Sequence, residues 1–118
     1  MRKLFFTIAL LFAFTSYSQV VINEIEADTP STDDKEFVEL KSVTPNFSLD
    51  GYVLVFFNGT TSGTGNLSYY AIDLDSYITD VNGIIHFGNA LVSPTPAILV
   101  VNAMIQNGPD VVALYQGN

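Results

Sequence analysis

The chain of 118 residues contains no cysteine and only one histidine. The lack of thiols excludes disulfides, thiolate zinc sites, cysteine nucleophiles and the usual lipoprotein anchor. With a single histidine, a metal site or a catalytic set has no second imidazole to draw on. The fold must therefore be held by packing of apolar side chains, which make up 48% of the residues.

Basic residues are also scarce, because four Lys and Arg stand against 12 Asp and Glu, for a formal net charge of −8. Arg2 and Lys3 lie at the N-terminus, so the chain beyond residue 19 has two lysines against all 12 acidic residues, a net charge of −10. A surface this negative repels nucleic-acid phosphates and anionic lipid headgroups. We expect no direct binding to nucleic acid.

The N-terminal segment has the residue order of a secretory signal peptide. Arg2 and Lys3 precede an apolar run at residues 4–14, and the small residues Ser16 and Ser18 then stand two apart, as at a cleavage site. The run is shorter than the roughly 20 apolar residues of a membrane span. We expect residues 1–19 to be a cleaved leader rather than a core element. Residues 20–118 would then be one secreted domain with no membrane span.

Beyond the leader, short apolar segments alternate with turn residues and show no helical period. The predicted strands are residues 20–27, 36–43, 52–58, 68–74, 84–87, 97–101 and 111–115. Segment 52–58 is apolar at nearly every position, which indicates a central strand covered on both faces. The predicted fold class is all-β, an antiparallel two-layer sandwich of about seven strands. The chain ends three residues after the last predicted strand, so we expect the sandwich to be incomplete at its C-terminus.

Alternation along a strand assigns side chains to faces. In the second predicted strand Val38 and Leu40 share one side, away from Glu39. In the first, the pattern sets Ile22 with Glu24 and Glu26, opposite Val21, Ile25 and Ala27. If these two strands pair, Glu24 and Glu39 can face each other. Paired carboxylates can perform acid–base chemistry, but exposed carboxylates on a sheet face explain them better.

Several segments, in this order and spacing, resemble the lamin-tail domain of secreted bacterial proteins. They are residues 22–25 (Ile-Asn-Glu-Ile), 36–40 (Glu-Phe-Val-Glu-Leu), 49–54, 70–75, 88–90 and 106–115. The family has an immunoglobulin-like β-sandwich and often stands at the N-terminus of extracellular nucleases and other multidomain secreted proteins. The resemblance implies a lamin-tail-like domain over residues 20–118 and an accessory role. It carries no catalytic residue onto this chain.

Acidic residues are the only candidate metal ligands. Asp73, Asp75, Asp80 and Asn82 place four oxygen-bearing side chains within ten positions, which suits calcium, although the spacing departs from the EF-hand pattern. Solvated turns are the alternative, because Asp and Asn are common turn residues. A second acidic loop contains Asp28, Asp33, Asp34 and Glu36, for which a solvated loop is again the preferred interpretation.

The remaining candidates are aromatic. His86 is expected to be a structural or surface residue, because no second histidine or cysteine can join it. The adjacent Tyr69 and Tyr70 should point to opposite faces of a regular strand. The tyrosines at these positions and at 52, 77 and 115 are candidates for a carbohydrate-stacking or protein-binding patch. The favoured alternative is that most of them belong to the core of the sandwich or its rim.

The function expected from the sequence is that of a non-catalytic binding or structural module of a secreted protein. Its partner would be a protein, a cell-surface component or a polymer, bound through end loops, exposed aromatics or an open sheet edge. No cofactor is expected apart from the calcium candidate. The alternative is the N-terminal accessory part of a secreted nuclease or hydrolase whose catalytic domain lies outside this sequence.

Overall fold

The computed structural model describes residues 18–63 and 65–117, so nearly all of the predicted leader lies outside the described residues. The described part forms seven strands and contains no helix that could cross a membrane. The strands are β1 (Val20–Glu26), β2 (Phe37–Ser42), β3 (Tyr52–Asn58), β4 (Leu67–Asp73), β5 (Ile84–Gly88), β6 (Ile98–Leu99) and β7 (Val111–Gln116). All seven predicted strands are present, and only β6 is much shorter than predicted.

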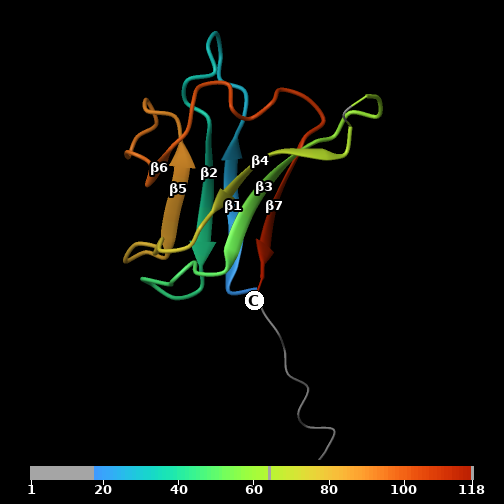
Figure 1. The fold of residues 1–118 in the computed structure, drawn as a ribbon. Helices are drawn as coiled ribbons and strands as arrows, with labels where there is room; N and C mark the ends of the chain where they lie inside the picture. The colour runs from blue at the N-terminus through green and yellow to red at the C-terminus, as the bar shows by residue number, and fades with distance from the viewer. Residues whose placement is uncertain (1–17, 64, 118) are drawn as a thin grey trace, which may run out of the picture.

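The strands form two sheets, one in the order β1-β2-β5-β6 and the other in the order β4-β3-β7. Figure 1 shows the three-stranded sheet crossing the four-stranded sheet obliquely. The predicted two-layer β-sandwich is therefore confirmed. One pairing differs from the antiparallel prediction: β6 runs parallel to β5. The segment between them is a long loop rather than a tight hairpin, so the chain can return and enter β6 in the direction of β5.

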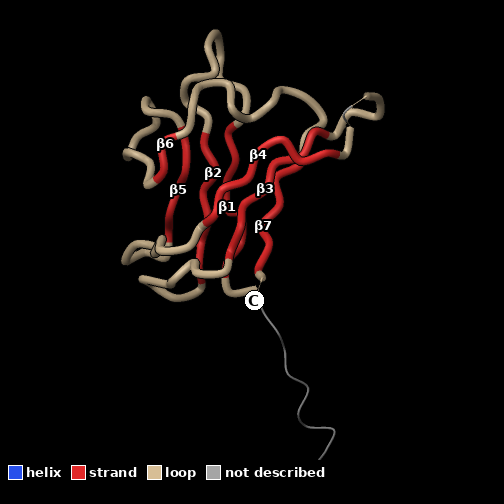
Figure 2. The backbone as a smooth tube through the Cα atoms, in the orientation of Figure 1, coloured by secondary structure: helices blue, strands red, loops and turns tan. Residues whose placement is uncertain are grey.

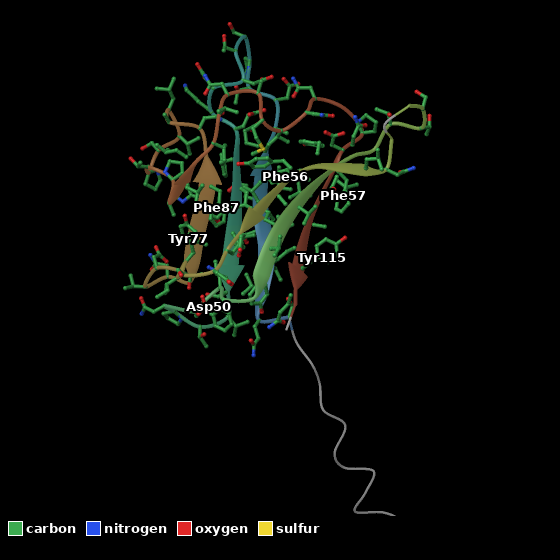
Figure 3. The ribbon with its side chains drawn as sticks, in the orientation of Figure 1. Asp50, Phe56, Phe57, Tyr77, Phe87 and Tyr115 are labelled. Carbon is green, nitrogen blue, oxygen red and sulfur yellow. The ribbon has the colours of Figure 1, made fainter. Side chains whose placement is uncertain are left out.

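The core lies between the sheets, where alternate side chains of each strand point inward. In β2, Val38 and Leu40 are fully buried, which confirms the predicted inner side. Phe56 of β3 and Phe87 of β5 are the largest fully buried side chains and come from opposite layers (Figure 3). The other fully buried apolar residues are Leu49, Leu54 and Leu74. The core thus draws on both sheets and on the loops that flank β3 and β4.

The first strand contains a bulge at Asn23 that changes which side chains face the core. The register pairs Ile22 with Leu40 and Ile25 with Val38, with a shift between these pairs. Because Leu40 and Val38 are core residues, Ile22 and Ile25 both lie on the inner side. The predicted placement of Ile22 opposite Ile25 is wrong, because the extra residue reverses the alternation.

The third strand lies between β4 and β7, so its prediction as a central strand is confirmed. Figure 2 shows β3 crossing the molecule with β4 on one side and β7 on the other. Its outward side chains Val53, Val55 and Phe57 are only half-buried. The prediction that β3 is covered on both faces is wrong for the outer side, since no third layer of described residues covers it.

Candidate functional site

Two of the predicted calcium ligands, Asp73 and Asp75, take part in hydrogen bonds at one end of the sandwich, where the loop before β3 meets the turn after β4. Asp75 Oδ1 accepts a hydrogen bond from the Gly51 N–H at 2.7 Å, and Asp50 Oδ1 accepts one from the Ser76 N–H at 2.7 Å. Asp73 Oδ1 accepts from the Asp75 N–H at 3.0 Å. The hydrogen bond from Ser76 is the main cause that lowers the pKa of Asp50, which lies at the lower end of the molecule in Figure 3. These carboxylates order the loops around β3.

The other two predicted ligands lie in the turn before β5. Asp80 Oδ1 accepts hydrogen bonds from the N–H groups of Asn82 and Ile84, each at 2.8 Å. The bond from Ile84 is the largest cause that lowers the pKa of Asp80. Among the described residues, no three acidic, histidine or cysteine side chains are grouped closely enough to hold a metal ion. The structure places Asp73 and Asp75 at and just after the end of β4, and Asp80 and Asn82 in the turn before β5. The three carboxylates accept hydrogen bonds, whereas Asn82 donates to Asp80.

The second acidic loop is not uniformly solvated, because Glu36 is fully buried. Its Oε2 accepts a hydrogen bond from the Met104 N–H at 2.8 Å, and its Oε1 has no partner among the described residues. Burial raises the pKa of Glu36, although the Met104 bond opposes this shift. Asp33 is tied to Asn107, whose Nδ2 donates to Asp33 Oδ2 at 2.8 Å. The interpretation of Glu36 as a solvated loop residue is wrong, because the loop before β7 covers it.

Ionisable side chains form a row on the outer side of the four-stranded sheet. The register pairs Glu24 with Glu39 and Glu39 with His86, which places all three side by side. Asn23 Nδ2 donates to Glu39 Oε1 at 2.7 Å, and His86 Nε2 lies 2.6 Å from the Pro94 carbonyl oxygen. The predicted facing of Glu24 and Glu39 is confirmed. Glu39 and His86 thus each contact a neighbouring polar group on the outer side of the sheet.

The tyrosines do not form one patch. A bulge in the β3–β4 pairing brings both Tyr69 and Tyr70 against Phe56, with ring centroids 6.2 and 5.9 Å from it. The predicted opposite facing of these two tyrosines is therefore wrong. Tyr115 alone lies beside an outward aromatic ring, that of Phe57, at 6.4 Å (Figure 3). The remaining two, Tyr52 and Tyr77, pack at the core.

Edge strands expose unpaired main-chain groups, and natural sheets protect them with bulges, charges, prolines or short length. Of the four edges here, β1 has the bulge at Asn23 and the charged Glu24, and β4 has a bulge and Asp73. The β6 edge is two residues long and follows Pro96. By contrast, β7 pairs with β3 over six residues and has no bulge, charge or proline. The β7 edge is the unprotected one.

Main-chain hydrogen bonding shows which residues of β7 face the open edge. The Gly117 N–H donates to the Gly51 carbonyl at 2.8 Å, so this pair bonds toward β3. Hydrogen-bonded and non-bonded pairs alternate along an antiparallel ladder. The N–H and C=O groups of Val112 and Leu114 therefore point away from β3. Figure 1 shows β7 at the margin of its sheet, with no strand beyond it.

The core is incompletely covered beside this edge. Val112 pairs with Phe56 and Leu114 with Leu54, whose side chains are fully buried, yet Val112 and Leu114 are only half-buried. On β1, which lies in the other sheet beside this edge, the inward side chain of Ile25 is 43% exposed. A groove between β1 and β7 is lined in part by Ile22 and Leu114. Inward apolar surface is thus accessible from the β7 side.

The outer side of the three-stranded sheet is also apolar, and we call it the apolar face. The register places these apolar residues on one side, together with Ser68 and Asp73 of β4: Val53, Val55, Phe57, Ala71, Val111, Ala113 and Tyr115. Neither β3 nor β7 contains a charged residue, so the 12 acidic residues lie on the other strands and the loops. The β7 edge is therefore uncharged, and the side chains of residues 111–115 on both of its faces are apolar.

No family model, curated protein or solved structure matches this chain. The candidate site therefore rests on geometry. The sequence predicts an open sheet edge as a route to binding but does not identify which edge. The signal was present in residues 111–115, an apolar segment without charge or proline, but the order of strands in the sheets was needed to place it at an edge.

Proposed function

We propose that this chain is a non-catalytic binding or structural module of a secreted protein, and that it binds an extended polypeptide segment by strand addition at β7. The observation that carries the proposal is the contrast among the four edges, of which β7 alone has no bulge, charge, proline or short length. In strand addition, main-chain hydrogen bonds supply affinity, and alternate side chains of the added strand supply specificity.

Other features support this role. The half-buried Val112 and Leu114 would be covered by the inward side chains of an added strand, and Val111 and Tyr115 by its outward ones. The resemblance to lamin-tail domains, which are immunoglobulin-like accessory modules, agrees with a binding role. Secretion is supported by the basic, apolar and small-residue order at residues 2–18.

The proposal is tested with a short blocked peptide in which valine and threonine alternate and one end carries lysine. We expect saturable binding by the purified protein in a calorimetric titration. V112P removes an N–H that points to the open edge, and a proline there leaves the β3–β7 ladder intact. Peptide binding should be lost in V112P.

The matched control is A71K on the opposite edge of the same sheet, which should bind the peptide as the unmodified chain does. Circular dichroism of both variants checks that the sheet is retained. No binding by the unmodified chain, or equal binding by a folded V112P, would contradict strand addition at β7.

A further inference from the structure

We infer that the β7 edge pairs with the β7 edge of a second copy of this chain, so that two three-stranded sheets join into one continuous sheet. This inference rests on the proposed strand addition and identifies the added strand as β7 of a second copy. The pairing is antiparallel about a two-fold axis, as in an isologous dimer, where the same surface is used on both copies.

The sequence of β7 is self-complementary when the axis passes through Ala113. Val112 of one copy then lies opposite Leu114 of the other, and Val111 lies opposite Tyr115. Inward residues meet inward residues and outward residues meet outward residues, because antiparallel strands centred on a residue keep their faces in phase. Aromatic and β-branched residues that lie opposite each other across strands are a favourable pairing.

The main-chain groups fit the same register. Val112 and Leu114 carry the N–H and C=O groups that point away from β3, as the bond between Gly117 and Gly51 implies. Two such residues from each copy form two hydrogen-bonded pairs, with about four main-chain hydrogen bonds across the axis. No strand of either copy has to open to make them.

Neighbouring registers are less favourable. An axis at Val112 would set the carboxylate of Asp110 opposite the inward Leu114, and an axis at Leu114 would leave Val111 opposite Gly117 instead of an aromatic ring. With the axis at Ala113, Asp110 lies opposite the amide of Gln116. The two copies therefore meet without placing like charges opposite each other.

The absence of charge in β7 allows a second copy to approach at this edge. The chain beyond residue 19 carries a net charge of −10, yet β3 and β7 carry none. Two copies that meet along β7 therefore bring no charged strand residue into the shared edge. The long-range repulsion between their acidic surfaces is screened by salt, so the dimer dissociation constant should fall as salt is raised toward physiological strength.

The test is sedimentation equilibrium of the purified protein over a range of concentrations, together with A113K, A113D and an equimolar mixture of the two. We expect a concentration-dependent dimer for the unmodified chain. In A113K or A113D alone, like charges face each other across the axis, and the dissociation constant should rise about tenfold or more. In the mixture, opposite charges face each other, and a heterodimer should form.

The control is A71K, which places the same lysine on the other edge strand, because Ala71 and Ala113 pair with the same residue, Val55. A71K should dimerise as the unmodified chain does. Restored dimer in the mixture supports the inference even if each single variant is less stable than the unmodified chain.

A monomer at all concentrations would overturn this inference while leaving strand addition intact if the valine–threonine peptide still binds. If the peptide also fails to bind, both the dimer and the proposed function fall. A dimer that A113K and A113D leave unchanged would place the contact elsewhere and would also overturn the inference.

Discussion

Glu36 and Asn89 are joined by two hydrogen bonds across 53 positions of sequence: the Glu36 N–H donates to Asn89 Oδ1 at 2.8 Å, and the Asn89 N–H donates to the Glu36 carbonyl at 2.9 Å. Asn89 Nδ2 also donates to the Val101 carbonyl at 2.8 Å. Both side chains are fully buried. This pair ties the start of β2 to the end of β5 and to the loop after β6.

Replacing Asn89 should destabilise the fold strongly. N89A leaves the Glu36 N–H and the Val100 carbonyl without their buried side-chain partner, and unsatisfied buried groups cost roughly 1–3 kcal/mol each. We expect the free energy of unfolding to fall by about 2–4 kcal/mol in urea denaturation. N102A, at an exposed asparagine in the same loop region, should change it by less than about 0.5 kcal/mol. Equal effects of the two variants would contradict the role of Asn89.

The buried carboxyl of Glu36 should make stability depend on pH. Burial raises its pKa above the ordinary value near 4.5, so the folded chain holds this proton at pH values where the unfolded chain has lost it. The stabilising contribution is full below the ordinary pKa and is lost as pH rises through the raised pKa. The E36Q side chain stays neutral at every pH, so the free energy of unfolding of this variant should not show the decline that Glu36 causes.

The measurement is the difference in free energy of unfolding between E36Q and the unmodified chain, over a series of buffers from below pH 4.5 upward. The difference should shift in favour of E36Q as pH rises. E39Q, on the outer side of β2, is the control. If the difference in free energy of unfolding between the two proteins stays constant with pH, Glu36 titrates alike in the folded and the unfolded chain, which would contradict the prediction.

Gly59 should not tolerate a side chain. A Cβ at this position would lie 1.4 Å from the Pro109 carbonyl oxygen, so the turn before β7 would have to move. G59A should lower the free energy of unfolding by about 1–3 kcal/mol, as overpacking does. G108A is the matched control in that turn, because a Cβ there meets no atom within 4 Å. Similar melting curves for G59A and the unmodified chain would contradict this close approach.

Calcium should leave the melting temperature unchanged. The oxygens of Asp75 and Asp80 accept main-chain hydrogen bonds in two different turns, and a metal would have to displace these bonds. Thermal unfolding followed with millimolar calcium, with magnesium and with a chelator tests this. A rise in melting temperature that calcium alone produces and the chelator reverses would instead place a calcium site at Asp73, Asp75, Asp80 and Asn82.

Much of the fold was predictable because the signals are local. Segment 52–58 is apolar at both odd and even positions, and it is the middle strand of its sheet. The alternation around Val38 and Leu40 identified the inner side of β2. The row of Glu24, Glu39 and His86 also follows from alternation once β2 is placed between β1 and β5.

The errors arose where one residue interrupts a regular pattern. Asn23 adds a residue to β1, so Ile22 and Ile25 share a side that simple alternation would separate. The bulge beside Phe56 does the same for Tyr69 and Tyr70. Glu36 looked like one more acidic loop residue, yet the loop around Met104, nearly seventy positions later, covers it.

The sequence by itself determined an acidic, thiol-free, all-β chain with seven strands, because composition and short-range alternation decide which segments become strands. Only the tertiary structure decided that β7 is an edge, that it is the unprotected one, and that Val112 and Leu114 face it. These properties depend on which distant strands become neighbours. That choice is made by side chains meeting across the core, and no single segment contains it.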